Sequence, residues 1–186
     1  MQIITARLIL RDFVADDWRA VQAYQSDARY FRYNPWTERP EAEVREFVQK
    51  FINHQTQDPR RKFQLAITLP ESGPLIGNVG IRRKAENEWE ADMGYELDPN
   101  YWGLGYATEA ARAIVTFGFH ELNLHRISAE CRAENTASVH VLEKLGMRRE
   151  GHLRENEYFQ ERWWDTLVYG LLEQDRHNDE HTHALP

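Results

Sequence analysis

The sequence predicts an α/β fold, in which a mixed central sheet of about six to seven strands carries helices on both faces. The first observation is a change of hydrophobic period near residue 60, from the spacing of a helix to the alternation of a strand. The second is a strand–helix–strand crossover that follows three successive strand segments. A length of 186 residues favours one compact domain. We expect that domain to cover residues 1–172, with a polar tail over residues 173–186.

The N-terminal part combines one strand with two helices. Arg7–Arg11 is typical of a strand, and Asp16–Ser26 has apolar residues at helical spacing. The aromatic segment Tyr30–Trp36 is broken by proline and is expected to be a loop. Pro40 suits the first turn of the next helix, which should end before Asp58. Its apolar stripe consists of Val44, Phe47, Val48, Phe51 and Ile52.

Strands dominate the rest of the chain. The segments Phe63–Ile67, Leu75–Arg83 and Glu90–Leu97 alternate as strands do and suggest a meander. Gly105–Glu121 is a long helix whose apolar residues surround much of its girth, so it should be largely buried. A strand, a helix closed by Gly146 and two final strands follow. Their expected ranges are Arg126–Cys131, Asn135–Leu145, Arg148–Tyr158 and Arg162–Leu172.

Composition excludes several classes of protein. The formal net charge of −7 argues against general nucleic-acid binding and favours either cationic partners or simple solubility. No apolar run is long enough to span a membrane, and the N-terminus lacks a secretory pattern, so we expect a cytoplasmic protein. Cys131 is the single cysteine and is expected to be a buried, inert thiol. We predict no metal site, because the spacing of His177, His181 and His183 is irregular.

A turn with two glycines joins the third strand of the meander to the long helix. Its sequence is Trp102-Gly103-Leu104-Gly105-Tyr106. The first amides of a helix have no partner within the helix, and the helix dipole favours an anion beside them. Glycine also lets the main chain approach a phosphate closely. Taken alone, this turn is a weak signal and fits an ordinary strand-to-helix connection better, and it lacks the lysine of a P-loop.

A second helix start lies thirty residues after Gly105. Asn135 is suited to cap this helix. Ser138 lies one turn further along on the same face. Each residue can also be an incidental feature of an ordinary helix.

Together the two segments resemble the GNAT superfamily of acyl-CoA N-acyltransferases. The strand ADMGYEL, the turn YWGLGYATEA and the helix ENTASVHVLEKLGM occur in the order and spacing of that family. The resemblance extends over Leu8–Leu171, nearly the whole chain. The final GHLRENEYFQERWWDTLVYGLL is similar to the RimJ/RimL branch of ribosomal-protein N-terminal acetyltransferases.

The resemblance implies acetyl-CoA as co-substrate and a set of residues that bind it. The pantetheine arm would pair with the strand backbone at Tyr95–Leu97, where the amide of Leu97 or a neighbour would polarise the thioester carbonyl. The pyrophosphate would lie on the amides of Gly103–Thr108, and Asn135 would bond the arm. The full set is Tyr95, Glu96, Leu97, Trp102, Gly103, Leu104, Gly105, Tyr106, Ala107, Thr108, Asn135, Ser138 and Lys144.

The resemblance also implies two catalytic side chains. Glu157 matches a general base that would act through a water, although it can equally be a surface glutamate beside Glu155. Ser138 would donate to the departing thiolate, and the placement of the two reactants would supply most of the catalysis. The sequence departs from the family pattern twice: Trp102 replaces a usual Gln or Arg, and Leu142 stands where many members have tyrosine.

The acceptor site is expected to use Asp165 and three aromatic residues from loops. Asp165 would bind a cationic acceptor or orient the last strands. Tyr33, Trp36 and Trp89 would line the acceptor cleft or simply pack. Specificity would then depend on the loops Arg29–Pro40 and Ala85–Trp89.

Three functions remain open on the sequence. The leading interpretation is acetylation of the N-terminal α-amine of a protein, with a basic peptide or ribosomal protein as partner. The alternatives are acetylation of a small amine (a polyamine, an aminoglycoside or a metabolite) and a non-catalytic acyl-CoA-binding domain. A homodimer is a further expectation, with an interface from the aromatic residues Tyr158, Phe159, Trp163 and Trp164.

Overall fold

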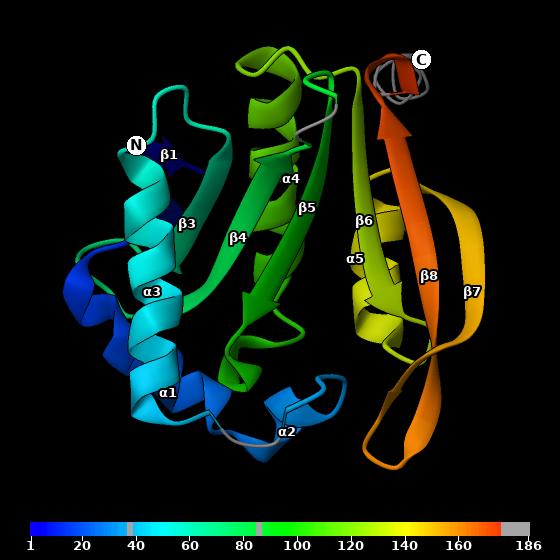
Figure 1. The fold of residues 1–186 in the computed structure, drawn as a ribbon. Helices are drawn as coiled ribbons and strands as arrows, with labels where there is room; N and C mark the ends of the chain where they lie inside the picture. Colours follow the sequence, from blue (N-terminus) through cyan, green and yellow to red (C-terminus); the bar gives the residue numbers. More distant parts are fainter. Residues whose placement is uncertain (37–38, 85–86, 176–186) are drawn as a thin grey trace. The chain divides into compact units, whose positions relative to one another are not determined.

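The structure, a computed structural model, describes residues 1–36, 39–84 and 87–175 (Figure 1). They form two compact units: unit 1 lies within Met1–Arg82 and Gly94–Ile114, and unit 2 lies within Arg83–Met93 and the described residues from Val115 onward. Eight strands make one mixed sheet in the order β1-β2-β3-β4-β5-β6-β8-β7. The predicted α/β class is confirmed, with a strand count slightly above the expected range.

Unit 1 contains the antiparallel part of the sheet. It consists of β1 (Gln2–Ile4), β2 (Ile9–Asp12), β3 (Lys62–Thr68), β4 (Leu75–Arg83) and the end of β5 (Glu90–Leu97). The strand β1 is the one that the sequence did not predict. It has three residues, and its pairing with β2, in which Ile3 lies opposite Leu10, defines it as a strand.

Helices pack on both faces of the unit 1 strands. On one face lie η1 (Ala15–Asp17), α1 (Trp18–Gln25), α2 (Ala28–Phe31) and α3 (Glu41–Gln55), and on the other lies the start of α4 (Tyr106–His120) (Figure 1). The first face buries a cluster made of Phe13, Val21, Tyr24, Tyr30, Val44, Val48, Phe51, Ala66 and Leu75. The expected loop at Tyr30–Trp36 was therefore wrong at its start, because Asp27 caps the short helix α2 by accepting from the Arg29 amide.

The connection from β5 to α4 determines where the candidate site lies. A 3₁₀ turn, η2 (Pro99–Tyr101), follows β5, and the Asp98 side chain caps it by accepting from the Asn100 amide at 2.8 Å. Within α4 the exposed residues are Arg112 and His120. This agrees with the prediction of a largely buried helix, which was based on apolar residues around most of its circumference.

Unit 2 contains the crossover and the final hairpin. Glu90–Asp92 of β5 pair in parallel with Arg126–Ser128 of β6 (Arg126–Arg132). The helix α5 (Thr136–Lys144) follows β6, and Gly146, at φ 80°, allows the chain to turn into β7. The strand β8 (Arg162–Leu172) pairs antiparallel with both β6 and β7 (Arg148–Phe159).

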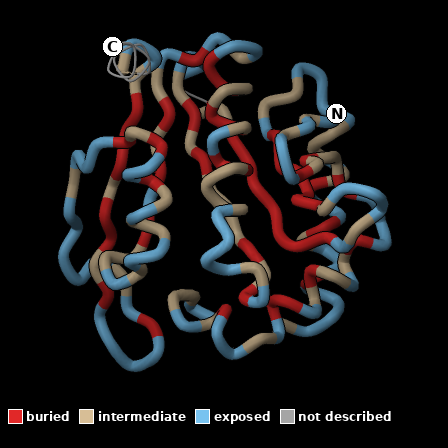
Figure 2. Tube along the Cα trace, turned by 180° about the vertical axis from the view of Figure 1, so that it is seen from behind, coloured by how far each residue is buried: buried red, intermediate tan, exposed pale blue. Residues whose placement is uncertain are grey.

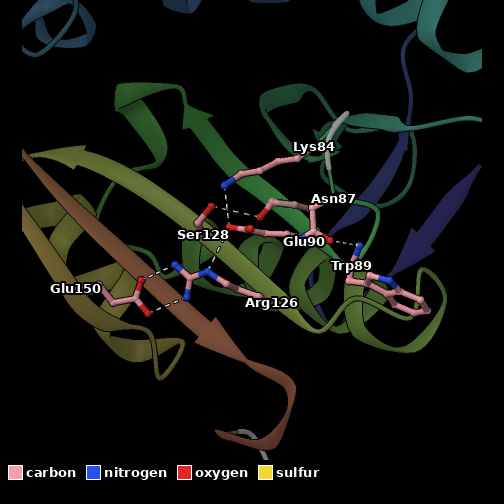
Figure 3. A network of polar contacts seen from close by, with 8 residues as sticks. Lys84, Asn87, Trp89, Glu90, Arg126, Ser128 and Glu150 are labelled. Atoms are coloured by element: carbon pink, nitrogen blue, oxygen red, sulfur yellow. Dashed lines mark hydrogen bonds and ion pairs between the residues drawn. The ribbon is translucent and has the colours of Figure 1, made fainter.

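A chain of ion pairs fixes the start of β6 in unit 2 (Figure 3). Glu90 accepts from Lys84 at 2.7 Å and from Arg126 at 3.2 Å, and Arg126 also bonds Glu150 at 2.7 Å. The last pair passes over β8 at Gly170, where a Cβ would come within 2.4 Å of both side chains. Glycine at this position therefore allows residues of β6 and β7 to meet across the strand between them.

Burial follows the inner strands of the sheet. In Figure 2 the buried residues run mainly along strands, while exposed residues run along the connecting loops; the outermost strands β1 and β7 are themselves mainly exposed. Among the helices of the described residues, none is both long and apolar enough to cross a membrane.

Candidate active site

The turn between η2 and α4 presents a row of free main-chain amides in unit 1. Gly103 and Gly105 have φ values of 76° and 81°, in the left-handed region that glycine adopts without strain. Leu104, between them, is exposed. Within the described part of the chain, none of the six amides of Gly103–Thr108 donates to a partner. Amides in this state at a helix start suit an anion, because binding supplies the partners that the helix does not.

Trp102 has a role within the protein itself. Its indole Nε1 donates to the carbonyl oxygen of Leu97 at 2.8 Å, so the side chain ties the turn to the end of β5. The bond uses the carbonyl that closes the predicted pantetheine-binding strand. Trp102 therefore secures the turn, and 46% of its surface stays exposed for contact with a ligand.

The side chain of Glu96 lies in a polar network on the face of unit 1 that carries α1 and α2. Its carboxylate accepts from Tyr24 at 3.0 Å and from Gln25 at 3.1 Å, and also from Tyr30 and Asn78. All four donors are neutral groups. Glu96 therefore links β5 to α1, α2 and β4 through its side chain, while only its main chain remains for a cofactor.

Burial and the negative charge of Glu96 raise the pKa of both phenols in this network. For Tyr24 and for Tyr30 burial is the larger cause, and the Glu96 charge adds to it. Both phenols therefore keep their protons and act as donors. The network continues into β3, because the Gln64 side-chain amide donates to Asn78 Oδ1, and both of these residues are buried.

Three residues that hold the turn were not predicted from the sequence. Thr5 and Arg7, just before β2, bond the carboxylate of Glu109 in the first turn of α4. Burial works to raise the pKa of Glu109, but the bonds from Thr5 and Arg7 and the charge of Arg7 hold that pKa below its ordinary value. An acid in the first turn of a helix was visible in the sequence, yet its partners lie about a hundred residues away, where no local pattern points to them.

In unit 2, α5 carries the predicted residues Asn135 and Ser138. The Asn135 side-chain oxygen accepts from the Ser138 amide at 3.1 Å, so Asn135 is the predicted N-cap. The Ser138 hydroxyl bonds the thiol of Cys131. Burial raises the pKa of that thiol to about 11, although the bond from Ser138 and the charge of Arg132 act in the opposite direction. Lys144 is exposed at the end of α5.

Glu157, the predicted general base, forms an ion pair. The Arg132 guanidinium bonds both of its carboxylate oxygens, at 2.6 and 2.5 Å, and also donates to Thr166 Oγ1 at 2.8 Å. A bidentate arginine engages both oxygens of the carboxylate. A water or an amine could bond Glu157 in their place only after this pair has opened.

Asp165 holds the bulged part of β7. It lies 2.6 Å from His152 Nε2 and accepts from the Glu155 amide at 2.8 Å. These two bonds and the nearby charges of His152 and Arg154 lower its pKa. Of the two roles considered for Asp165, these contacts support the orientation of the last strands.

The predicted aromatic wall is divided between the units. Tyr33 and Trp36 belong to unit 1, where Arg32 and Arg39 lie over their rings at 5.4 Å. Trp89 belongs to unit 2 and is 64% exposed, with its amide bonded to Asn87 (Figure 3). The loops proposed to set specificity lie partly outside the described residues, at positions 37–38 and 85–86.

The four aromatic residues expected at a dimer interface have two different environments. Phe159 and Trp164 are buried and stacked on each other at 4.8 Å, so within this chain they are core residues. Tyr158 and Trp163 are exposed and meet edge to face at 5.2 Å. The dimer stays a prediction, and any interface here would use this second pair.

Metal ligands do not cluster in the described part of the chain. Among those residues, no group of three or more His, Cys, Asp or Glu side chains is arranged to hold a metal ion. The histidines of the predicted tail, at positions 177, 181 and 183, lie outside the described residues.

A mixed sheet whose fifth strand leads through a glycine turn into a helix with free amides fits the class of CoA-dependent acyltransferases. Residues 7–148 match the family model described as "Acetyltransferase (GNAT) domain". The chain belongs to this GNAT family. It is 39% identical over 178 residues to the uncharacterized N-acetyltransferase YnaD of Bacillus subtilis (strain 168), covering 94% of this chain and 99% of that protein. A GNAT-family acetyltransferase structure from Bacillus anthracis has a TM-score of 0.81 and 36% identity, covering 94% and 99% of the two chains.

Relatives that act on known acceptors are more distant. Spermidine N(1)-acetyltransferase of Escherichia coli (strain K12) is 29% identical over 152 residues, which cover 81% of this chain and 77% of that protein. A structure of RimL, a ribosomal α-N-protein acetyltransferase in complex with coenzyme A, has a TM-score of 0.81 at 21% identity, with 92% and 98% of the chains covered. The second comparison establishes the shared fold alone.

The enzyme is thus an acetyl-CoA-dependent N-acetyltransferase. The residues of unit 1 fit the diphosphate of the co-substrate, because Gly103 has open space where a Cβ would lie and the amides that follow have no partner among the residues that the structure describes. The thioester of acetyl-CoA supplies the activated acetyl group. The chain's own groups bind and orient it.

Proposed function

We propose that the acceptor is the N-terminal α-amine of a protein. The observation that carries this proposal is the ion pair between Glu157 and Arg132, because it leaves the predicted base engaged. An α-amine has a pKa of about 7.7–8.0 and is partly neutral near pH 7.5, whereas a lysine-like amine near 10.4 is almost fully protonated. An enzyme whose carboxylate is already paired favours the acceptor that needs the least help in losing its proton.

The reaction is a direct transfer. The neutral amine nitrogen attacks the thioester carbonyl carbon, the C–N bond forms, the C–S bond breaks, and the amine proton leaves to solvent. Amides at Gly103–Thr108 hold the diphosphate, and the Leu97 amide polarises the carbonyl. Ser138 turns its hydroxyl from Cys131 to the departing thiolate and stabilises its charge. Glu157 accepts the amine proton through a water only in molecules where its pair with Arg132 has opened.

A thiol-release assay over an acceptor panel tests the proposal. The panel contains a basic peptide with a free N-terminus, the same peptide N-terminally blocked but carrying one lysine, spermidine and an aminoglycoside. We expect thiol release with the first peptide and less than a tenth of that rate with the blocked one, given the difference in amine pKa. A preference for spermidine would make a small amine the acceptor, as in the Escherichia coli relative. Tight CoA binding without release with any amine would indicate a non-catalytic domain.

Two variants test the catalytic residues in the same assay. Ser138→Ala should lower kcat by about tenfold to a hundredfold, because one charge-stabilising donor is lost. Glu157→Gln should lower kcat less than tenfold if proton transfer goes mainly to solvent, and by about a hundredfold or more if Glu157 is the main base. Unchanged rates in both variants would remove both residues from the mechanism and leave the co-substrate assignment intact.

A further inference from the structure

Arg7 contacts the diphosphate turn from the segment before β2. Its Nη1 donates to the carbonyl oxygen of Leu104 at 3.0 Å, and its guanidinium carbon lies 4.6 Å from the centre of the Tyr106 ring. A Cβ on Gly105 would stand 3.4 Å from Arg7 Nη2. Arg7 therefore contacts Leu104 and Tyr106 and lies beside Gly105 between them, all within unit 1.

The bond to Leu104 fixes the direction of an amide. The peptide between Leu104 and Gly105 is planar and trans, so its C=O and N–H point in opposite directions. Because Arg7 holds the carbonyl on its own side, the Gly105 N–H is directed away from Arg7. This amide is one of the six that have no partner in the described part of the chain. Without Arg7, glycine at φ 81° would leave this peptide free to rotate.

Arg7 also compensates a negative charge beside the turn. Glu109 lies in the first turn of α4, where its carboxylate would repel a diphosphate. It is bonded by Arg7 Nε at 2.7 Å, by the Arg7 amide at 2.9 Å and by Thr5 Oγ1 at 2.7 Å. The Glu109 side chain is 18% exposed and that of Arg7 is 48% exposed, so the cation is the outer partner of the pair.

We infer that Arg7 is a positioning residue for the diphosphate of acetyl-CoA. It sets the direction of the Gly105 amide and cancels the charge of Glu109, so that an anion meets oriented N–H groups and a neutralised carboxylate. The inference rests on the assignment of the co-substrate to this turn. It adds a residue that lies before the first predicted motif and that neither the glycines nor the helix start reveal.

Comparing two thioesters separates this role from general support of the fold. S-acetylpantetheine carries the same acetyl group as acetyl-CoA but has no diphosphate. We expect Arg7→Ala to raise the KM for acetyl-CoA on the order of tenfold, because a charge-assisted contact and a charge balance are both lost. The kcat and the KM for S-acetylpantetheine should stay within about twofold, because neither depends on an anion at the turn.

Three further variants refine the assignment. Arg7→Lys keeps the positive charge but cannot bond Leu104 and Glu109 at the same time as a guanidinium does. Its KM for acetyl-CoA should lie between that of Arg7→Ala and that of the unchanged enzyme. Adding Glu109→Gln to Arg7→Ala should recover part of the lost affinity, because no uncompensated carboxylate remains. Arg45→Ala is the matched control, since Arg45 is equally exposed, belongs to unit 1 and pairs with Glu41 on α3. It should leave both KM values unchanged.

Two results would overturn the inference: an unchanged KM for acetyl-CoA in Arg7→Ala, or equal losses with both thioesters. Calorimetry with CoA and pantetheine gives the same comparison without turnover. If the enzyme released no thiol with any amine, the proposed acceptor would fail. Weaker CoA binding with unchanged pantetheine binding in Arg7→Ala would still support the role of Arg7.

Discussion

At the scale of single residues, three of the side chains predicted to act on the substrates already have partners within their own units. Trp102 bonds Leu97, Ser138 bonds Cys131 and Glu157 bonds Arg132. Such contacts hold side chains in defined rotamers before a ligand arrives, which lowers the entropy cost of binding. They also mean that Ser138 and Glu157 must give up an existing bond before they can act on the substrates.

The thiol of Cys131 gives a test at this scale. Burial raises its pKa to about 11, so the native protein holds the proton more tightly than the unfolded chain does. The stability that this contributes is fully present below the ordinary thiol pKa and is lost as the pH rises through about 11. At pH 8 we expect iodoacetamide to modify native Cys131 on the order of a hundredfold more slowly than an ordinary exposed thiol, because little thiolate is present.

Alkylation in urea provides the control for this prediction. The unfolded chain should react at the rate of a free cysteine, with a pKa near about 8.5. Native protein that reacts as fast as the unfolded chain at pH 8 would show that the thiol is neither buried nor shifted.

At the scale of elements, two strand glycines are predicted to differ sharply in their tolerance of alanine. A Cβ on Gly77 of β4 would lie 2.3 Å from the main-chain oxygen of Glu96 and 2.9 Å from the Leu97 Cα. Backbone cannot move aside cheaply, so Gly77→Ala should lower the free energy of unfolding by about 1–3 kcal/mol. It should also raise the KM for acetyl-CoA, because it displaces the end of β5.

Gly170→Ala in β8 is the matched comparison. The atoms nearest to its Cβ would be the ends of the Arg126 and Glu150 side chains, which can swing aside. The loss is then that of a partly exposed ion pair, about 0.2–1 kcal/mol. Both changes replace a strand glycine by alanine, so intrinsic strand preference cancels between them. Equal costs in urea unfolding would contradict the argument from close approach.

Local patterns predicted most of these elements, and contacts over long sequence distances account for the rest. The ranges of β4, β5 and β8 agree with the predicted strands, because alternation and turn residues are both present in the sequence. The strand β1 could not be predicted, because three residues carry no usable period and pairing with β2 defines them. The glycine turn was predicted because its residues are consecutive in the sequence. The partners of Glu109 and Glu96 come from segments far away in the chain, so no local pattern could indicate them.

At the scale of the whole molecule, the net charge of −7 gives a prediction about substrate encounter. An acidic surface attracts a cationic acceptor and repels anionic acetyl-CoA, and salt screens both effects. With saturating acetyl-CoA, kcat/KM for a basic peptide should fall several-fold between about 20 and 500 mM salt. The KM for acetyl-CoA should stay level or fall.

A peptide in which glutamine replaces each lysine is the control for this measurement. Its kcat/KM should change little with salt, because little charge remains to be steered. An identical salt response from both peptides would limit the acidic surface to a role in solubility.

The polar row formed by the buried residues Gln64 and Asn78 and the half-buried Glu96 has a consequence for assembly of the sheet. These side chains lie on three adjacent strands, and each contacts the next. If one strand slid by a single residue, its side chain of the row would point to the opposite face of the sheet. The other side chains would then lose their hydrogen-bond partners, at a cost of about 1–3 kcal/mol for each unpaired group. The row thus selects the native strand register. Sheets with a shifted register are less stable, so the C-terminal end of β5 is always held in the same position.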